Sequence, residues 1–376
     1  MPDADRIERL RRVMADQGLR HLVGLTGAFH NFLDCDPVVA LTGLRAIGPC
    51  AALLDADGAL TLLVSPAWDL QRARERCAGV QVAATHDLIG DLLSLLRQRG
   101  TAPGTIGVAM ADAFPVGEQR RLLAELGDAV RAADELLLRA GAVKSAAELA
   151  DAREATRIGE LGYQRLLEVV RPGMREFELA AELLHYMGGL GAPDNFLLMS
   201  ASQHNQAVRA PGRRVLERGD VLLAEITPMV NNQFSQICRT VVLGPASDLQ
   251  RQRFALQQQA MAAGRLAAVA GATVASVTRA MDEVIGAAGF ADYCRPPYIR
   301  VRGHGLGNVS SLPGDITVDN EVVLQAGMIF VMHPNQYFPD VGYLMCGEPV
   351  AISADGPAQV LSAQWAELDQ IEEFGA

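Results

Sequence analysis

The sequence is poor in aromatic residues and contains no long apolar run. Only 5% of its 376 residues are Phe, Trp or Tyr, and no window reaches eighteen consecutive apolar residues. A membrane-spanning helix needs about 20 such residues. The first ten residues, "MPDADRIERL", are charged and helical in pattern rather than an apolar signal core. We therefore expect a soluble, cytoplasmic protein with no membrane partner.

The chain also lacks a basic surplus and paired cysteines. Its net charge is −11, with acids and bases interspersed, so we expect no nucleic-acid partner. The cysteines are scattered and none forms a C-x-x-C pair, which argues against a disulfide framework. We expect Cys50 and Cys77 to be small buried apolar residues, and Cys238 to pack in a core.

The length is sufficient for two globular domains. Over residues 1–140 helix and strand signals alternate, which predicts a smaller α/β domain. The expected helices are "DRIERLRRVMADQG", "DLIGDLLSLLRQRG" and "PVGEQRRLLAELG", and the expected strands are "HLVGLTG", "CAALLDADG", "ALTLLVSP" and "TIGVAM".

Residues 141–376 have long helices followed by long strands, which predicts a second domain and an α+β fold overall. Ser145 and Glu148 form a capping-box pattern before a long helical segment. The strand pair "VLLAEITPMVNNQFSQICRTVVLG" turns at Asn231 and Asn232.

This order of elements then repeats. Two helices, a glycine-rich segment "RVRGHGLGNVSSLPG" and another strand pair, "AGMIFVMHPNQYFPDVGYLMCGEPVAIS", follow one another. A glycine lies six residues before Glu225 and also six before His333, and a cysteine lies thirteen residues after each. Such duplication indicates two copies of one unit that face each other. We therefore predict that Glu225 and His333, at equivalent positions, share a central cleft.

These segments resemble the creatinase, prolidase and aminopeptidase P group, whose catalytic domain has the pita-bread fold. The resemblance rests on "AGAVKSAAELADAREA", "ERGDVLLAEITPMVNNQFSQICRT", "RGHGLG" and "AGMIFVMHPNQY", and it extends over nearly the whole chain. It implies a pita-bread domain over residues 141–376, a creatinase-like domain over residues 1–140, and a homodimer.

The resemblance also implies where metal ligands would lie. Metallopeptidases of the group hold two divalent ions with Asp, Asp, His, Glu and Glu. The matching residues here are Glu225, Gln236, His304, His333 and Cys346. Only Glu225 offers a bridging carboxylate, so we expect neither a two-metal site nor a standard Xaa-Pro metallopeptidase.

The metal-free relatives, creatinase and the ectoine hydrolases, are then the closest in pattern. The stretch "GDVLLAEITPMV" matches creatinase closely, whereas creatinase's key histidine is missing near Val208. We therefore expect no cofactor and a hydrolase of a non-peptide C–N bond (an amide, amidine or cyclic amidine) in a small polar substrate that bears a carboxylate. Glu225, His304 and His333 would be the catalytic acids and bases.

Other residues are candidates for substrate binding. Gln236 and Cys346 lie at ligand positions, and His204 stands upstream of the missing histidine. Arg302 could hold a carboxylate, as could Arg300 or Arg239. Arg45 lies in the region that can reach over the partner subunit's cleft in this group.

Two alternatives remain open. One zinc or iron ion could be bound by Glu225, Gln236, His304, His333 and Cys346, giving a mononuclear metal-dependent hydrolase or lyase. The chain could also be a non-catalytic binding protein on the same scaffold. The replaced ligand positions hold polar residues rather than apolar or small ones, which favours a functional site of altered chemistry over the loss of catalysis.

Overall fold

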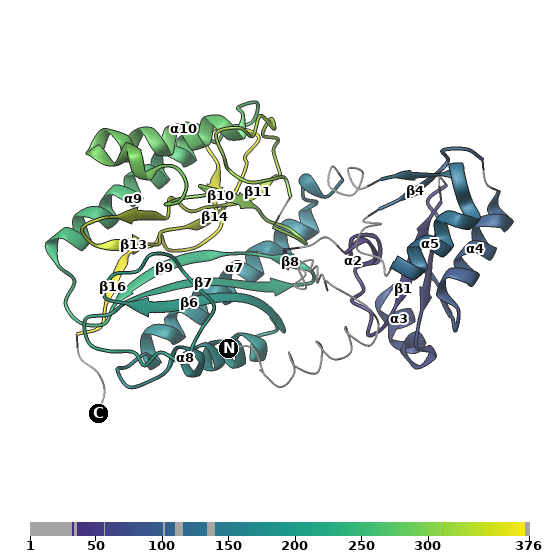
Figure 1. Cartoon of the computed structure of the whole chain (residues 1–376), viewed down its shortest axis with the longest axis horizontal. Helices are drawn as coiled ribbons and strands as arrows, with labels where there is room; N and C mark the ends of the chain where they lie inside the picture. Colours follow the sequence, from purple (N-terminus) through teal and green to yellow (C-terminus); the bar gives the residue numbers. More distant parts are fainter. Residues whose placement is uncertain are drawn as a thin grey trace, which may run out of the picture.

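The computed structural model describes residues 32–33, 36–55, 57–100, 102–109, 116–133, 140–310 and 312–372. The expected helix "DRIERLRRVMADQG" and strand "HLVGLTG" lie outside these residues. Figure 1 shows a smaller lobe built from the first part of the chain and a larger lobe built from the rest. No helix among the described residues has both the length and the apolar character needed to cross a membrane.

The smaller lobe has the expected alternation of helices and strands. Strands β1 and β2 are antiparallel, and β2 and β3 are parallel, in the order β1-β2-β3, while β4 and β5 form a separate parallel pair. Its elements are α2 (Pro37–Thr42), β1 (Cys50–Leu54), β2 (Leu60–Val64), η1 (Ala67–Asp69), α3 (Leu70–Arg76), β3 (Gln81–Ala84), α4 (Leu88–Arg99), β4 (Ile106–Val108), α5 (Val116–Leu126), η3 (Gly127–Ala129) and β5 (Val130–Ala132).

The first half of the larger lobe packs two helices on one sheet. The predicted capping box of Ser145 and Glu148 is confirmed at the start of α7, and Asn231 and Asn232 have the positive φ angles, 45° and 67°, of a tight turn. The sheet order is β16-β9-β7-β6. The elements are α7 (Ala146–Val169), α8 (Glu176–Gly189), β6 (Asp194–Ser202), β7 (Val221–Val230), β8 (Gln233–Phe234), β9 (Ile237–Val242) and β16 (Leu368–Gln370).

The second half repeats this plan with a sheet in the order β10-β11-β14-β15. The strand pair expected after the glycine-rich segment is divided, because a separate hairpin of β12 and β13 intervenes between β11 and β14. The elements are α9 (Asp248–Ala267), α10 (Val274–Ile285), η4 (Gly286–Phe290), η5 (Ala291–Tyr293), β10 (Gly303–Gly305), β11 (Ile329–Met332), β12 (Gln336–Phe338), β13 (Gly342–Leu344), β14 (Glu348–Ala351) and β15 (Gln359–Val360).

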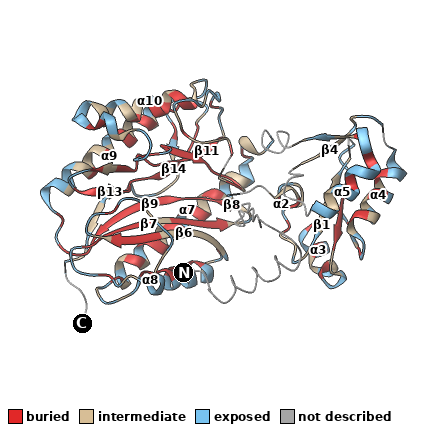
Figure 2. Cartoon of the chain, viewed as in Figure 1, coloured by how far each residue is buried: buried red, intermediate tan, exposed pale blue. Residues whose placement is uncertain are grey.

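Strand alternation explains why an inner surface exists between the two sheets. Leu222, Ala224 and Ile226 of β7 pack on α7 and α8. Phe330 and Met332 of β11 pack in the cluster that contains α9 and α10. Successive side chains of a strand point to opposite faces, so the residues between these point away from the helices, to the inner face of each sheet. Figure 2 shows the buried strands enclosed between the helices.

Candidate active site

Four paired residues form one row across the two sheets. Glu225 of β7 pairs with Cys238 of β9, and Cys238 forms an antiparallel bridge with Gly347. The pairing of Met332 with Glu348 continues the register, so that Gly347 lies opposite His333. A Cβ atom on Gly347 would lie 2.6 Å from the Cβ of His333 and 3.0 Å from that of Cys238. The structure therefore places Glu225 and His333 at the two ends of a single row.

Glu225 is a half-buried carboxylate on the inner face of β7. Burial raises its pKa from 4.5 to about 7, although the positive charge of Arg300 opposes this rise. A carboxyl group with this pKa is partly ionised near neutrality, and it can both accept and return a proton.

His333 follows directly after β11, and only 6% of its surface is exposed. Its Nδ1 atom is buried and has no hydrogen-bond partner among the described residues. Burial, with a further contribution from His304, lowers its pKa from 6.5 to about 3. His333 is therefore a neutral imidazole with a buried Nδ1 that no described residue satisfies.

His304 lies on β10, next to His333. The two rings are 5.4 Å apart between centroids and nearly perpendicular, at 67°. Nδ1 of His304 lies 2.9 Å from the carbonyl oxygen of Gly305, and a carbonyl can only accept, so Nδ1 carries the proton. Burial lowers the pKa of His304, which leaves Nε2 as the lone-pair nitrogen of a neutral ring.

Gln236 contacts Cys238, the residue that pairs with Glu225 in the row. Oε1 of Gln236 accepts a hydrogen bond from Thr227 Oγ1 at 3.3 Å, and its Nε2 donates to Cys238 Sγ at 3.6 Å. Burial and the charge of Glu225 raise the pKa of the Cys238 thiol well above its usual value. Cys238 is thus a neutral thiol beside Glu225, and not only the core residue that the sequence suggested.

Cys346 is buried among apolar residues beside the row. Its backbone N–H donates to Asn335 Oδ1 at 3.0 Å, and burial together with the charge of Glu348 raises its pKa to about 12. Gly347, and not Cys346, is the residue whose Cα faces His333 and Cys238. The structure therefore does not bring the thiol of Cys346 into this row.

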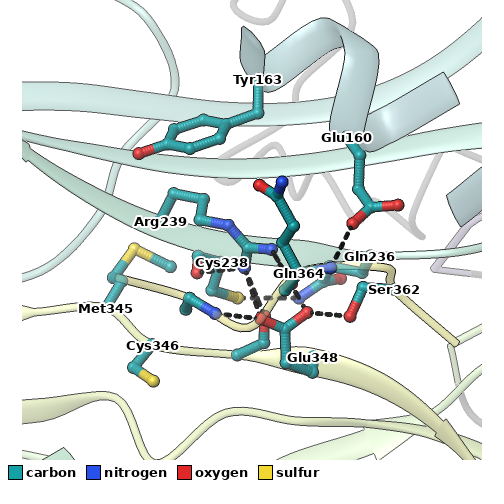
Figure 3. Close-up of polar contacts among 12 residues, drawn as sticks. Glu160, Tyr163, Gln236, Cys238, Arg239, Met345, Cys346, Glu348, Ser362 and Gln364 are labelled. Atoms are coloured by element: carbon teal, nitrogen blue, oxygen red, sulfur yellow. Dashed lines mark hydrogen bonds and ion pairs between the residues drawn. The ribbon is translucent and has the colours of Figure 1, made fainter. Parts of the chain in front are cut away.

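An ion pair of Arg239 and Glu348 supports the strands from the side that faces α7 (Figure 3). Both side chains are buried, and Arg239 Nη1 lies 3.0 Å from Glu348 Oε1. Glu348 also accepts hydrogen bonds from Ser362 and from the N–H of Ala366, and the Arg239 guanidinium lies over the ring of Tyr163. Arg239 is therefore a structural cation, and it does not enter the inner face.

Two other arginines differ in their freedom to bind a ligand. Arg302 is 2% exposed, and it donates to Asp282 at 2.6 Å and to the carbonyl of Asn335 at 3.1 Å. Arg300 has a side chain that is 76% exposed and pairs with Asp315. Its charge lowers the pKa of both histidines as well as that of Glu225.

Arg45 and His204 lie at the edges of the site. Arg45 donates to Asp194 at 2.7 Å and to Asn232 at 3.1 Å, so its side chain is held by β6 and by the β7–β8 turn of its own chain. His204 packs edge-on against Tyr337 at 5.8 Å, and its Nε2 lies 3.2 Å from the carbonyl oxygen of Pro339.

Sequence reasoning did not identify Tyr343. This residue pairs with Tyr337 across the hairpin of β12 and β13. Burial and the charge of Glu225 raise the pKa of its phenol, which therefore stays protonated beside the carboxylate. The hairpin that carries it was hidden within an apparently simple strand pair, and the sequence held no signal for its direction.

Comparison with known proteins identifies the family. Residues 150–356 match the model described as "Metallopeptidase family M24". This match covers more than half of the chain, and the chain therefore belongs to this family. The expected pita-bread fold of α+β type is confirmed by the solved structures that it resembles.

Individual relatives agree with this assignment. The chain is 25% identical to the Xaa-Pro dipeptidase of Pyrococcus furiosus over 333 residues, covering 87% of this chain and 91% of the relative. It is 27% identical to the probable dipeptidase PepE of Mycobacterium tuberculosis over 265 residues, 69% of each chain. The solved structure of an Xaa-Pro dipeptidase from Bacillus anthracis has a TM-score of 0.79 at 18% identity and covers 98% of this chain and 99% of its own, which shows the fold.

These findings correct three expectations. The relatives are named as peptidases, which contradicts a hydrolase of non-peptide C–N bonds and contradicts the exclusion of a standard Xaa-Pro metallopeptidase. The family description contradicts the expectation of no metal cofactor. The expectations were wrong because they inferred the reaction from five ligand positions, whereas the relatives match over most of the chain. The first alternative, a metal-dependent hydrolase on the same scaffold, agrees better with these relatives and with the family description.

The residues of the inner face nevertheless do not fit the two-ion centre that the resemblance implies. Glu225 is the one carboxylate among the five matched positions, Gln236 is neutral, and Gly347, beside Cys346, leaves no room for a side chain. Within the described ranges, no three His, Cys, Asp or Glu side chains are gathered in a metal-binding arrangement. Two dications at close range need bridging carboxylates to offset their repulsion, and this donor set does not supply them.

Proposed function

We propose that this chain hydrolyses the peptide bond of short peptides, and that Glu225, His304 and His333 carry out the reaction. The main support is the similarity to proteins named Xaa-Pro dipeptidase and dipeptidase, which extends over most of the chain. The closer likeness to creatinase in "GDVLLAEITPMV" stays a prediction, as does the homodimer.

The residues of the cleft suit this reaction. Glu225, with a pKa of about 7, accepts a proton from the attacking water and returns it to the leaving nitrogen. Nε2 of His304 and Nδ1 of His333 are neutral nitrogens that can orient water or substrate. The Tyr343 phenol stays protonated beside Glu225, so it can donate a hydrogen bond to the oxyanion that develops on the peptide carbonyl.

A second candidate is a protein that binds short peptides without cleaving them. This candidate is favoured by the close approach of His333 and Cys238 to Gly347, which leaves no space for a further carboxylate in the row. It is also favoured by the neutral amide of Gln236, which is held by Thr227.

One experiment separates the two candidates. The full chain is incubated with a panel of dipeptides, including Xaa-Pro members, with and without added Mn²⁺, Co²⁺ or Zn²⁺, and free amino acids are quantified. We expect cleavage that Glu225→Gln abolishes and that Glu283→Gln, on the exposed surface of α10, leaves unchanged. Calorimetric binding of dipeptides without release of amino acids would instead establish the binding protein.

A further inference from the structure

A cavity lies on the outer face of the first sheet, where residues of α7 meet the segment that leads into β16. Its volume is about 390 Å³, which is within the range of small-molecule sites. Arg239 of β9 lies in its wall, whereas the neighbouring residue of that strand, Cys238, belongs to the row of paired residues on the inner face. Successive residues of a strand point to opposite faces, so the cavity and the row lie on opposite sides of the sheet.

Three carboxylates give this cavity a negative charge. Glu160, Glu367 and Asp369 line it, and Arg239 is the one cationic residue that does so in the described part of the chain. The charge of Arg239 is already balanced, because its Nη1 lies 3.0 Å from the buried carboxylate of Glu348. No cation of the cavity wall therefore neutralises the three carboxylates, and the cavity attracts positive charge.

Neutral donors hold two of these carboxylates in place. Oε1 of Glu160 accepts hydrogen bonds from the backbone N–H groups of Ala363, at 2.8 Å, and of Gln364, at 3.0 Å (Figure 3). Oδ2 of Asp369 accepts a hydrogen bond from the phenol of Tyr163. The second oxygen of each carboxylate has no hydrogen-bond donor among the described residues, so it can accept one from a ligand.

Two aromatic side chains complete the wall. Tyr163 is 8% exposed, and the guanidinium of Arg239 lies 5.5 Å from the centroid of its ring, so one face of this ring is occupied. Trp365 is 38% exposed. An exposed indole beside carboxylates favours an organic cation, because the ring attracts the positive charge and its surface packs on the carbon atoms of the ligand.

The arrangement of the carboxylates decides which kind of cation fits. Within the described ranges, no three His, Cys, Asp or Glu side chains are gathered in a metal-binding arrangement, so Glu160, Glu367 and Asp369 do not converge on one ion. The volume of about 390 Å³ also exceeds what a single ion fills. Carboxylates that lie apart are matched by positive charges that lie apart, joined by an apolar chain.

We propose that this cavity binds an extended organic cation, such as a diamine, which carries two positively charged nitrogens on an apolar chain. One ammonium group contacts Glu160, the other contacts Glu367 and Asp369, and the chain packs on the ring of Trp365. This site does not depend on the proposed function, because it lies on the other face of the sheet from the row of Glu225 and His333.

The test is calorimetric titration of the full chain near neutral pH and at constant ionic strength. Four probes are compared: hexamethylenediamine, hexylamine, hexanediol and Mg²⁺. We expect the diamine to bind most tightly. Hexylamine should bind about tenfold more weakly, because it lacks one charged hydrogen-bonding group. Hexanediol, which has the same length without charge, and Mg²⁺, which is a single point charge, should not bind measurably.

Variants assign the binding to this cavity. Glu160→Gln keeps a carbonyl that accepts the two backbone N–H groups but removes the charge, and Glu367→Gln changes an exposed residue. We expect each to weaken diamine binding about tenfold. Trp365→Ala should weaken it about two- to fivefold, whereas Trp365→Phe keeps a ring and most of the affinity. Glu321→Gln, an exposed carboxylate outside the cavity, is the matched control and should bind like the wild type.

Several results would overturn the proposal. They are no measurable binding of the diamine, equal binding of hexanediol, tighter binding of Mg²⁺, or an affinity that survives both Glu160→Gln and Glu367→Gln. An equal loss in Glu321→Gln would show a general attraction to an acidic protein and would overturn it as well. The melting temperature of each variant without ligand separates a lost contact from a lost fold, and Glu367→Gln, at the surface, tests the site even if Glu160→Gln unfolds.

Discussion

Glu225 and His333 stand at opposite ends of one row of paired residues that runs through Cys238 and Gly347. Each comes from the same position of a duplicated unit, so the pseudo-symmetry of the chain brings an acid and an imidazole to a common surface. Burial shifts the two groups in opposite directions, raising the pKa of Glu225 to about 7 and lowering that of His333 to about 3. Near neutrality, Glu225 is the group in the row that exchanges its proton.

Glu225 should make the fold less stable as the pH rises. Its pKa is 4.5 in the unfolded chain and about 7 in the folded chain, so the folded state binds more protons between these values and stability falls across this window. We expect Glu225→Gln to raise the free energy of unfolding above pH 7 by about 1–3 kcal/mol. Urea denaturation at pH 5 and pH 8 measures this, and an equal effect at both pH values would contradict it.

His333 should make the fold less stable as the pH falls, which is the opposite of the effect of Glu225. Its pKa is 6.5 in the unfolded chain and about 3 in the folded chain, so the unfolded state binds more protons between these values. Stability is therefore lost as the pH falls from 6.5 towards 3. We expect His333→Gln to flatten this acid limb, as followed by circular dichroism, whereas an unchanged limb would show that another group causes it.

Gly347 should not tolerate a methyl group. A Cβ atom there would lie 2.6 Å from His333 Cβ, so His333 or the strand must shift. We expect Gly347→Ala to lower the free energy of unfolding by about 1–3 kcal/mol and to reduce turnover by displacing His333. Gly117→Ala is the control, since no atom lies within 4 Å of its added Cβ. Wild-type stability and turnover in Gly347→Ala would refute the close approach.

Removing one member of the Arg239–Glu348 pair should destabilise the fold more than removing both. Both side chains are buried, with exposures of 4% and 0%. We expect Glu348→Gln to lower the free energy of unfolding by about 3–5 kcal/mol, because it leaves the guanidinium without its counter-charge. In the double variant Arg239→Met/Glu348→Leu, most of this loss should return. A double variant that is less stable than the single one would show that the ion pair itself stabilises the strands.

Much of the architecture could be predicted because local patterns determine it. The capping box at Ser145 and Glu148 sets the start of α7, and the duplicated spacing places Glu225 and His333 on the two sheets that the bridge of Cys238 and Gly347 joins. The hairpin of β12 and β13 could not be predicted, because its residues alternate like those of the flanking strands. Tyr343 and Gly347 were missed for the same reason, since their directions depend on a register that only the folded chain fixes.

The reaction was harder to predict than the fold. Five positions suggested a departure from peptidase chemistry, whereas the similarity to dipeptidases extends over most of the chain.

The central claim, that Glu225 is the acid and base of peptide hydrolysis in this cleft, is tested most directly by the pH dependence of kcat/KM for a cleaved dipeptide. The account predicts an ascending limb with a midpoint near pH 7 in the wild type, no measurable rate at any pH in Glu225→Gln, and a midpoint at higher pH in Arg300→Ala, because the opposing charge is removed. A Glu225→Gln variant with the wild-type rate and limb would contradict it.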